Sequence, residues 1–235
     1  MKSLFLYLLF SLIISCKFEK NNEPTIDFNE IAQTRSQTDS LMISKIDSAK
    51  VPPSIKYEGK FKDGYIWNYK NEKNIVFITE TGIFQDKKFK HEFEYGRDAE
   101  LFCYSYNLNS NSLNWKIYDF VADCPVDIVA GFIDNTFKIT DLDKNGIAEI
   151  WMMYKTGCHG DVSPSEMKII MYEGSQKFAM RGENKVQFGI DDNGKPQFNG
   201  GNYMLDKNFE NAPEVFKTYA KNLWSKNMIE KQNWK

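Results

Sequence analysis

Short runs of β-branched and aromatic residues, separated by turn residues, recur through most of this 235-residue chain. Runs such as GYIWNY, AELFCYSYNL and MKIIMYEG are each followed within a few residues by another run of the same kind. This spacing is typical of antiparallel hairpins, and the pair Asn193-Gly194 is a further hairpin signal. No period of roughly 20–50 residues repeats, so a full propeller is not supported. The pattern predicts a mainly β fold, in which antiparallel hairpins form a sandwich-like sheet or a partial propeller.

The end of the chain has a different pattern, which predicts one C-terminal helix near residues 213–230. Apolar residues between Val215 and Trp224 fall on one helical face, and Pro213 stands near the start of the pattern. Far upstream, Pro52 and Pro53 mark a boundary, because tandem prolines do not join regular elements easily. We therefore expect a single β-rich domain over residues 51–235, with the helix docked on its sheet.

The first residues predict export. Lys2 precedes LFLYLLFSLII, an apolar run of 11 residues. A bilayer span needs roughly 20 residues, so residues 1–15 are predicted to be a signal peptide. Cys16 follows an apolar and a small residue, which resembles the lipobox of bacterial lipoproteins. The resemblance implies that Cys16 becomes a lipidated N-terminus, held stably by several acyl chains; the alternative is an ordinary signal peptide with a chance cysteine.

The residue after the cysteine bears on which membrane would hold the anchor. It is Lys17 rather than Asp, so nothing resembles the inner-membrane retention signal, and we expect an outer-membrane lipoprotein that faces the periplasm or the cell surface. Residues 16–50 are then the lipidated N-terminus and a flexible tether, rich in polar residues, with a short helical piece around 41–46.

Charge argues against one class of partner. The chain has 30 basic and 32 acidic residues, and no basic patch of the kind that neutralises phosphates is indicated. Nucleic acid is therefore not expected as a partner. The membrane is expected, through the lipid anchor.

Three cysteines follow Cys16, and an exported protein meets an oxidising compartment in which a pair is expected. Cys103 lies in a strand-like run, where a small buried thiol fits well. Cys124 and Cys158 both lie beside turn residues. We predict a disulfide between Cys124 and Cys158, which limits the freedom of the unfolded chain between them.

The stretch DLDKNGIAE, residues 141–149, places oxygen-bearing side chains at alternating positions. Calcium takes six to eight oxygens, and a tight turn at a glycine lets such side chains converge. The residues that could bind the ion are Asp141, Asp143, Asn145 and Glu149, with the main-chain carbonyl of Ile147.

This stretch is not an EF-hand, because Met152 stands where that loop needs a bidentate glutamate. It resembles the calcium loops of FG-GAP and integrin-type hairpins, which lie between two strands. A bound Ca²⁺ would be structural here, since nothing nearby offers an activated water or paired bases. The alternative is a surface hairpin whose Asp and Asn residues merely favour turn geometry.

His159, Asp161 and Ser163 lie close together but do not predict catalysis, because a Ser–His–acid triad is assembled from separate segments of a fold. Residues 163–166 fit a capping box, which predicts a single helical turn. Asp161 is expected to order the loop beside the disulfide. Arg181 could contact an anionic ligand or the acidic loop, although a surface ion pair is the simpler interpretation. His91, in a charged run, is interpreted as solvated surface.

Several of these motifs together resemble a family of small Gram-negative lipoproteins labelled as surface-polysaccharide biosynthesis proteins. The resemblance covers about residues 118–182 and the lipoprotein start. Its motifs are Asp123-Cys124-Pro125, the acidic stretch 141–149, and residues 158–164, 167–173 and 179–182. The label implies a role in making or displaying cell-surface glycan, and it carries no catalytic residue to this chain.

Three functions remain open. The first is a non-enzymatic accessory that binds surface glycan or an envelope assembly protein. The second is a glycan-modifying enzyme of the envelope, and the third is a structural lipoprotein without a ligand. A concave aromatic face built from Trp67, Tyr69 and Trp151 would favour glycan binding, whereas two converging carboxylates in a deep pocket would favour the enzyme.

Overall fold

A computed structural model describes residues 41–69, 71–85 and 89–230 of the chain. The predicted signal peptide, Cys16 and most of the predicted tether lie outside these residues. No helix in the described part of the chain is long and apolar enough to cross a membrane.

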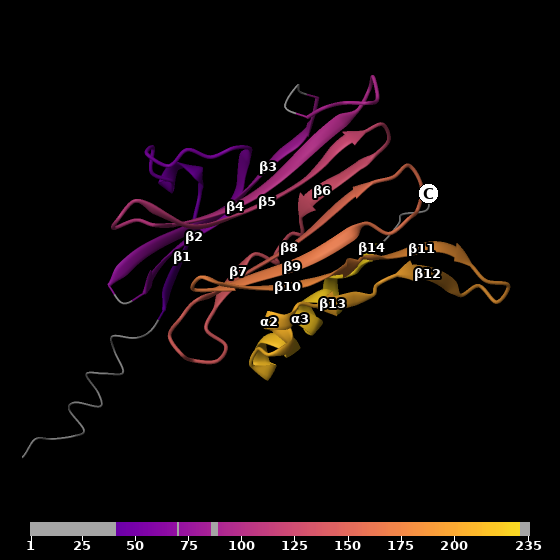
Figure 1. Cartoon of the computed structure of the whole chain (residues 1–235). Coiled ribbons are helices and arrows are strands. Elements are labelled where there is room, and N and C mark those ends of the chain that lie inside the picture. The colour runs from indigo at the N-terminus through magenta and orange to yellow at the C-terminus, as the bar shows by residue number, and fades with distance from the viewer. Residues whose placement is uncertain (1–40, 70, 86–88, 231–235) are drawn as a thin grey trace, which may run out of the picture. The chain divides into compact units, whose positions relative to one another are not determined.

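The first sheet is an antiparallel meander of five strands in chain order (Figure 1). Residues with positive φ, Asn71 and Asn111, stand in the turns between its second and third and between its fourth and fifth strands, because asparagine tolerates that backbone conformation. The strands are β1 (Met42–Ile46), β2 (Lys60–Tyr69), β3 (Glu72–Phe84), β4 (Arg97–Asn107) and β5 (Ser112–Cys124).

The second sheet has β8 near its centre. Its strand order is β13-β10-β9-β8-β6, and β7 pairs with β8 along the same edge as β6. All its pairings are antiparallel. The strands are β6 (Ile128–Phe132), β7 (Lys138–Thr140), β8 (Glu149–Cys158), β9 (Glu166–Glu173), β10 (Gln176–Glu183) and β13 (Tyr203–Leu205).

Smaller elements complete the described part. A third sheet has the order β12-β11-β14, in which β14 runs parallel to β11. The hairpin at Asn193-Gly194 is confirmed as the connection from β11 to β12. The remaining elements are the 3₁₀ helix η1 (Ser48–Lys50), β11 (Lys185–Ile190), β12 (Pro196–Gly200), α2 (Lys207–Glu210), α3 (Glu214–Asn227) and β14 (Ile229–Glu230).

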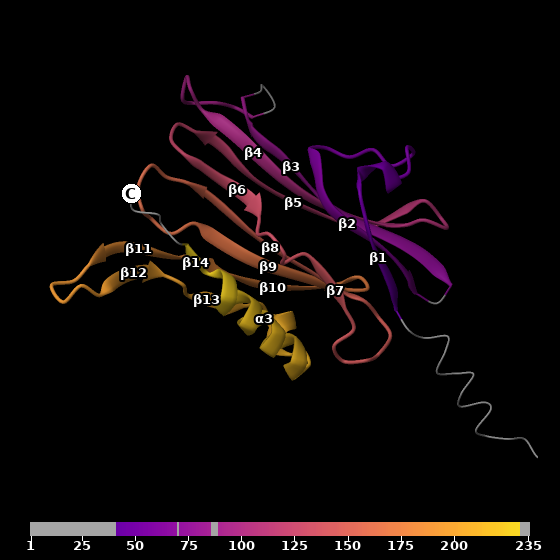
Figure 2. The ribbon, with the colours of Figure 1, turned by 180° about the vertical axis from the view of Figure 1, so that it is seen from behind.

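The first and second sheets pack face to face as a sandwich, and α3 covers the other face of the second sheet (Figures 1 and 2). Alternate residues of β8 point to opposite faces. Met152 and Tyr154 belong to the core between the sheets, whereas Trp151 and Met153 belong to the core beneath α3. Because β8 is buried on both faces, its sequence is a nearly continuous apolar run instead of an alternating one.

The C-terminal helix is confirmed, over Glu214–Asn227. Phe216, Ala220 and Trp224 are its buried residues, spaced four apart along one face. Val215, which was expected on the same face, is 39% exposed. The Trp224 indole N–H donates to the main-chain oxygen of Gly201 at 3.2 Å, so its burial leaves no polar atom unpaired.

The predicted disulfide is present between Cys124 and Cys158, which are 34 residues apart in sequence. It joins the last residue of β5 to the last residue of β8, and therefore links the first sheet to the second. Cys103 is a free, buried thiol, as expected.

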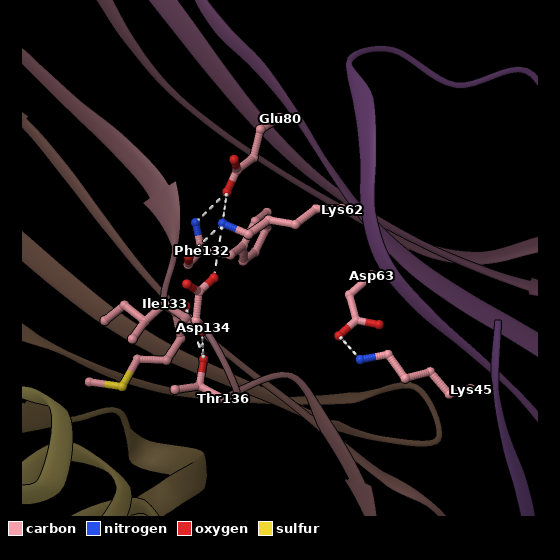
Figure 3. Close-up of polar contacts among 9 residues, drawn as sticks. Lys45, Lys62, Asp63, Glu80, Phe132, Ile133, Asp134 and Thr136 are labelled. Atoms are coloured by element: carbon pink, nitrogen blue, oxygen red, sulfur yellow. Dashed lines mark hydrogen bonds and ion pairs between the residues drawn. The ribbon is translucent and has the colours of Figure 1, made fainter. Parts of the chain in front are cut away.

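A polar contact also joins the two sheets (Figure 3). Glu80 Oε1, on β3, accepts hydrogen bonds from the Phe132 main-chain N–H at 2.7 Å and from Lys62 Nζ at 2.9 Å. Lys62 Nζ also donates to the Phe132 oxygen at 2.9 Å and lies 3.5 Å from Asp134 Oδ1. Glu80 thus accepts a hydrogen bond from a main-chain donor on β6, and Lys62 neutralises part of the charge of the Glu80 carboxylate.

Two local expectations are wrong. The segment 41–46 is not helical, because Met42–Ile46 pair with β2 as a strand, so regular structure begins inside the predicted tether. Residues 163–166 form no helical turn. The Ser165 N–H donates to Asn184 Oδ1 at 2.7 Å, and the extended chain enters β9 at Glu166.

Replacing Cys124 and Cys158 together by alanine should lower the free energy of unfolding by about 3–4 kcal/mol, because the cross-link closes a long loop in the unfolded chain. Urea unfolding of the two proteins measures the difference. Cys103→Ala is the control, since it removes a buried thiol without removing a cross-link. A loss below about 1 kcal/mol in the double variant would contradict the expectation.

Glu80→Ala should cost about 1–3 kcal/mol, because the Phe132 N–H loses its acceptor at the contact between the sheets. Lys45→Ala is the matched control. It breaks the Lys45–Asp63 pair of Figure 3, whose lysine side chain is 66% exposed, and should cost about 1 kcal/mol or less. Equal losses in the two variants, measured by urea unfolding, would show that the inter-sheet contact has no special weight.

Candidate functional site

The acidic stretch forms the connection between β7 and β8, at one end of the second sheet. Thr140 pairs with Glu149 as the last residue pair of that hairpin, so the residues between them must reverse the chain. Lys144 and Gly146 do so with φ values of 61° and 81°. Glycine adopts this conformation without strain, and lysine does so at a modest cost.

Asp141, Asp143 and Glu149 converge in this loop. One oxygen from each carboxylate lies within 4.8 Å of the others, and Glu149 is completely buried. Like charges so close together repel one another strongly in a partly buried site. The residues predicted as acidic ligands are therefore brought together by the fold.

One oxygen of this cluster lacks a hydrogen-bond partner. Asp141 Oδ1 is buried, and no donor in the described part of the chain reaches it. The other oxygen, Oδ2, accepts from the Gly146 N–H at 3.2 Å. Because a buried oxygen without a partner lowers the stability of the fold, a hydrogen-bond donor or a cation at this point would stabilise the loop.

Glu149 is held in place by donors from the same hairpin. The Thr140 hydroxyl donates to Glu149 Oε2 at 2.6 Å, and the Leu142 N–H donates to Oε1 at 2.8 Å. Trp151 Nε1 donates in turn to the Thr140 oxygen at 2.8 Å. Burial raises the pKa of Glu149 above its ordinary value, and the hydrogen bonds from Thr140 and Leu142 oppose that rise.

The side chain of Asn145, a fourth predicted ligand, is used within the loop. The Asn145 side-chain amide donates to Asp143 Oδ2 at 3.0 Å and to Glu173 Oε1 at 2.6 Å, and its oxygen accepts from the Ile147 N–H at 2.7 Å. Asn145 therefore offers its amide nitrogen, not its oxygen, to the carboxylates. Glu173 was not predicted as part of the site, because it comes from the end of β9, 24 residues beyond Glu149.

The donor set fits a hard cation better than a transition metal. It consists of carboxylate oxygens, without a cysteine or histidine nitrogen among the converging groups. Oxygen ligands of this kind suit calcium, and the exposed side of the loop leaves room for water to complete the shell.

The chain leaves the acidic loop through Ile147 and Ala148, which line a hollow of about 270 Å³ between the first and second sheets. Trp67 and Tyr69 also line it, as does Trp115. Two members of the predicted aromatic face therefore lie together. The third, Trp151, does not belong to it, because its side chain is completely buried on the opposite face of the second sheet, 4.6 Å from the Tyr219 ring centre.

His159, Asp161 and Ser163 do not form a triad. His159 Nε2 lies 2.9 Å from the oxygen of Ser165, not Ser163, and Ser165 is only 2% exposed. The Ser163 N–H donates to Asp161 Oδ1 at 3.0 Å, and hydrogen bonds from Ser163 hold the pKa of Asp161 below its ordinary value. These contacts shape the turn that follows the disulfide.

The strand β8 separates this turn from the acidic loop. Glu149 is its first residue and Cys158 its last, so the two regions lie about 30 Å apart at the usual rise of a strand. Arg181 also lies away from the acidic loop. It is exposed, and in the strand register of β10 and β9 it stands opposite Lys168, whereas the loop lies near the register pair of Glu149 and Glu173. A contact between Arg181 and the loop is therefore excluded, and a role with an anionic ligand stays a prediction.

The interpretation of His91 as solvated surface is wrong. Its Nε2 lies 2.8 Å from Asp98 Oδ2, and the Asp98 side chain is completely buried. The Asp123 N–H donates to the same carboxylate at 2.9 Å, so His91 covers a buried acidic group next to the disulfide.

Comparison of the chain with family models, curated proteins and solved structures found no match. Its function is therefore inferred from its residues and their arrangement.

Proposed function

We propose that this protein is an outer-membrane lipoprotein, anchored through Cys16, that assists the assembly or display of surface polysaccharide by binding and not by catalysis. The observation that carries the proposal is the hollow between the sheets, which combines aromatic side chains with polar ones next to the acidic loop. The family resemblance of the stretch 118–182 supplies the setting.

The lining of the hollow favours a binding role over hydrolysis. Glycoside hydrolysis requires a pair of carboxyl groups on either side of the scissile bond. Among the described residues that line the hollow, Glu72 is the only one with a carboxylate. The carboxylates that do converge, in the acidic loop, include the fully buried Glu149, which is occupied by hydrogen bonds from Thr140 and Leu142.

The second part of the proposal is that the acidic loop holds a structural Ca²⁺. Asp141, Asp143 and Glu149 would supply carboxylate oxygens, and the Ile147 carbonyl is a further candidate. The cation would pair with the buried Asp141 Oδ1 and reduce the repulsion among the carboxylates. Since the loop continues directly into Ile147 and Ala148, the ion would also fix one wall of the hollow.

Calcium should raise the melting temperature of the protein relative to the same protein in EDTA. At a calcium concentration 100 times the Kd, binding contributes about 2.7 kcal/mol, which corresponds to a rise of about 5–10 °C for a chain of this size. The rise should vanish in the variant Asp141→Asn/Asp143→Asn. Asp192→Asn, in the exposed β11–β12 turn, is the control and should keep the rise. Superimposed melting curves with EDTA and calcium would refute the calcium proposal.

The electrophoretic profile of surface polysaccharide should change in cells that lack the gene. The wild-type gene should restore it, and neither Cys16→Ala nor Asp141→Ala/Asp143→Ala should do so fully. Asp191→Ala/Asp192→Ala, a change of equal charge in another turn, should restore it as the wild type does. Labelling with radioactive palmitate checks that the Cys16 variant lacks lipid. An unchanged profile in the deleted strain would overturn the polysaccharide role.

A further inference from the structure

The hollow beside the acidic loop lies at one end of the sandwich, between strands of the first sheet and connections of the second. The strands β2, β3, β4 and β5 contribute lining residues from the first sheet. The acidic loop, the first residues of β8 and the β9–β10 turn contribute those of the second sheet. The hollow is thus an opening between the two layers and not a gap within one of them.

Aromatic and aliphatic groups form the inner part of this opening. Trp67 is 5% exposed and Ile150 3%, so they form its base. Tyr69 and Trp115 are half-buried and stand nearer to solvent. The Trp115 ring is fixed on its sheet-facing side, because it stacks on Tyr172 with the ring centres 4.1 Å apart and the planes 11° from parallel. It therefore presents a rigid apolar surface, which binds with little loss of side-chain entropy.

Amides and one carboxylate form the polar part. The Asn107 amide donates to Glu72 Oε2 at 2.7 Å, which fixes both groups at the mouth. The amide of the exposed Asn114 lies 3.3 Å from the Ser105 hydroxyl oxygen and 3.4 Å from Asn74 Oδ1. These last contacts are long for hydrogen bonds, so a ligand hydroxyl could replace them at little cost.

The combination of aromatic and polar groups in the hollow indicates a class of ligand. A pyranose ring carries C–H groups on its faces and hydroxyls around its edge, so an aromatic plane beside amide and carboxylate groups matches both parts. The volume of about 270 Å³ is just below the roughly 300–1,000 Å³ of typical small-molecule sites, which suits one sugar unit better than a longer segment.

The charge of the residues around the hollow narrows the class of sugar further. None of the described residues that line the hollow is a lysine or arginine, whereas Glu72 lines it. A uronic acid, sialic acid or sulfated sugar would place its negative charge beside the Glu72 carboxylate, with no lysine or arginine among the described lining residues to pair with it.

We propose that this hollow binds a single uncharged pyranose unit of the surface glycan, stacked on Trp115 and hydrogen-bonded by Glu72, Asn107 and Asn114. The inference rests on the proposed function and adds to it the place of binding and the chemistry of the ligand. The Tyr69 ring and the small part of Trp67 that solvent reaches complete the apolar contact.

The test uses the full mature lipoprotein, purified in a zwitterionic detergent without a sugar headgroup. It is applied, with calcium present, to an array of immobilised uncharged oligosaccharides beside uronated, sialylated and sulfated ones. Binding should be confined to uncharged glycans. Trp115→Ala should weaken it at least about tenfold, as expected for the loss of a central aromatic contact.

Two further variants keep the test decisive if Trp115→Ala unfolds the protein. Glu72→Ala and Asn107→Ala change groups at the mouth, and each should weaken binding to the same glycans. Glu72 is exposed, so Glu72→Ala should do this without lowering the melting temperature. Asn107 Oδ1 also accepts from the Asn109 and Ser110 N–H groups, so Asn107→Ala is expected to lower the melting temperature as well. Phe188→Ala removes an aromatic ring that is 49% exposed on β11 and should leave binding unchanged. Binding to charged glycans only, no binding to uncharged glycans, or binding that Glu72→Ala and Asn107→Ala leave unaltered would overturn the inference.

The same variants separate this inference from the proposed function. A deleted strain with a polysaccharide defect that the Glu72→Ala/Asn107→Ala gene restores fully would keep the proposed function and reject the hollow as its site. An unchanged profile in the deleted strain would reject the proposed function, and array binding that depends on Glu72 and Asn107 would still support a sugar site.

Discussion

The burial of β8 on both faces is the constraint on which the rest of this structure depends. One set of its side chains, with Met152 and Tyr154, completes the core between the sheets. The alternate set, with Trp151 and Met153, needs a second cover, which α3 provides. A helix at the end of the chain is therefore required by residues in the middle of it, because leaving Trp151 and Met153 exposed would forfeit several kcal/mol of burial.

The two ends of β8 carry different chemistry for a related reason. Other elements cover both faces of a strand that is buried on both sides, so the polar segments that connect it to its neighbours lie at its two ends. At its last residue, a disulfide to β5 ties the second sheet to the first. Its first residue, Glu149, belongs to the acidic loop, where repulsion among carboxylates opposes compact packing. The cross-link thus stabilises one end of the sandwich, and a cation would do so at the other.

Much of the fold could be predicted from the sequence, because hairpins leave local signals. The turns at Asn71, Asn111 and Gly194 use residues that tolerate positive φ, and the strands beside them are β-branched and aromatic. The disulfide was also predictable, since Cys124 and Cys158 stand beside turns. The segment 41–46 was not, because its own propensity is weak and its pairing with β2 decides its conformation.

The candidate site was predictable only where it is local. Asp141, Asp143 and Glu149 belong to one hairpin, so their spacing could indicate a shared site. Glu173 and Trp115 reach it from other strands, and no short-range pattern reports which hairpins will face each other. Trp151 shows the same limit. Alternation along β8 places Trp151 on the opposite face from Ile150, which lines the hollow, but the alternation does not indicate which of the two faces the first sheet covers.

In the proposed function, the acidic loop and the hollow act as one site with two roles. The carboxylates of Asp141, Asp143 and Glu149 are not among the groups that line the hollow, but the residues directly after the turn, Ile147 and Ala148, are. A cation bound to the loop would therefore not contact a ligand in the hollow. It would affect the ligand by holding these wall residues in place. Because Asn145 bonds to Glu173 at the end of β9, ordering the loop would also order the β9–β10 turn, whose Gly174 and Ser175 form part of the same wall. Under both proposals, removal of calcium should weaken sugar binding by changing the shape of this wall, while the stacking surface of Trp115, fixed separately by Tyr172, stays in place.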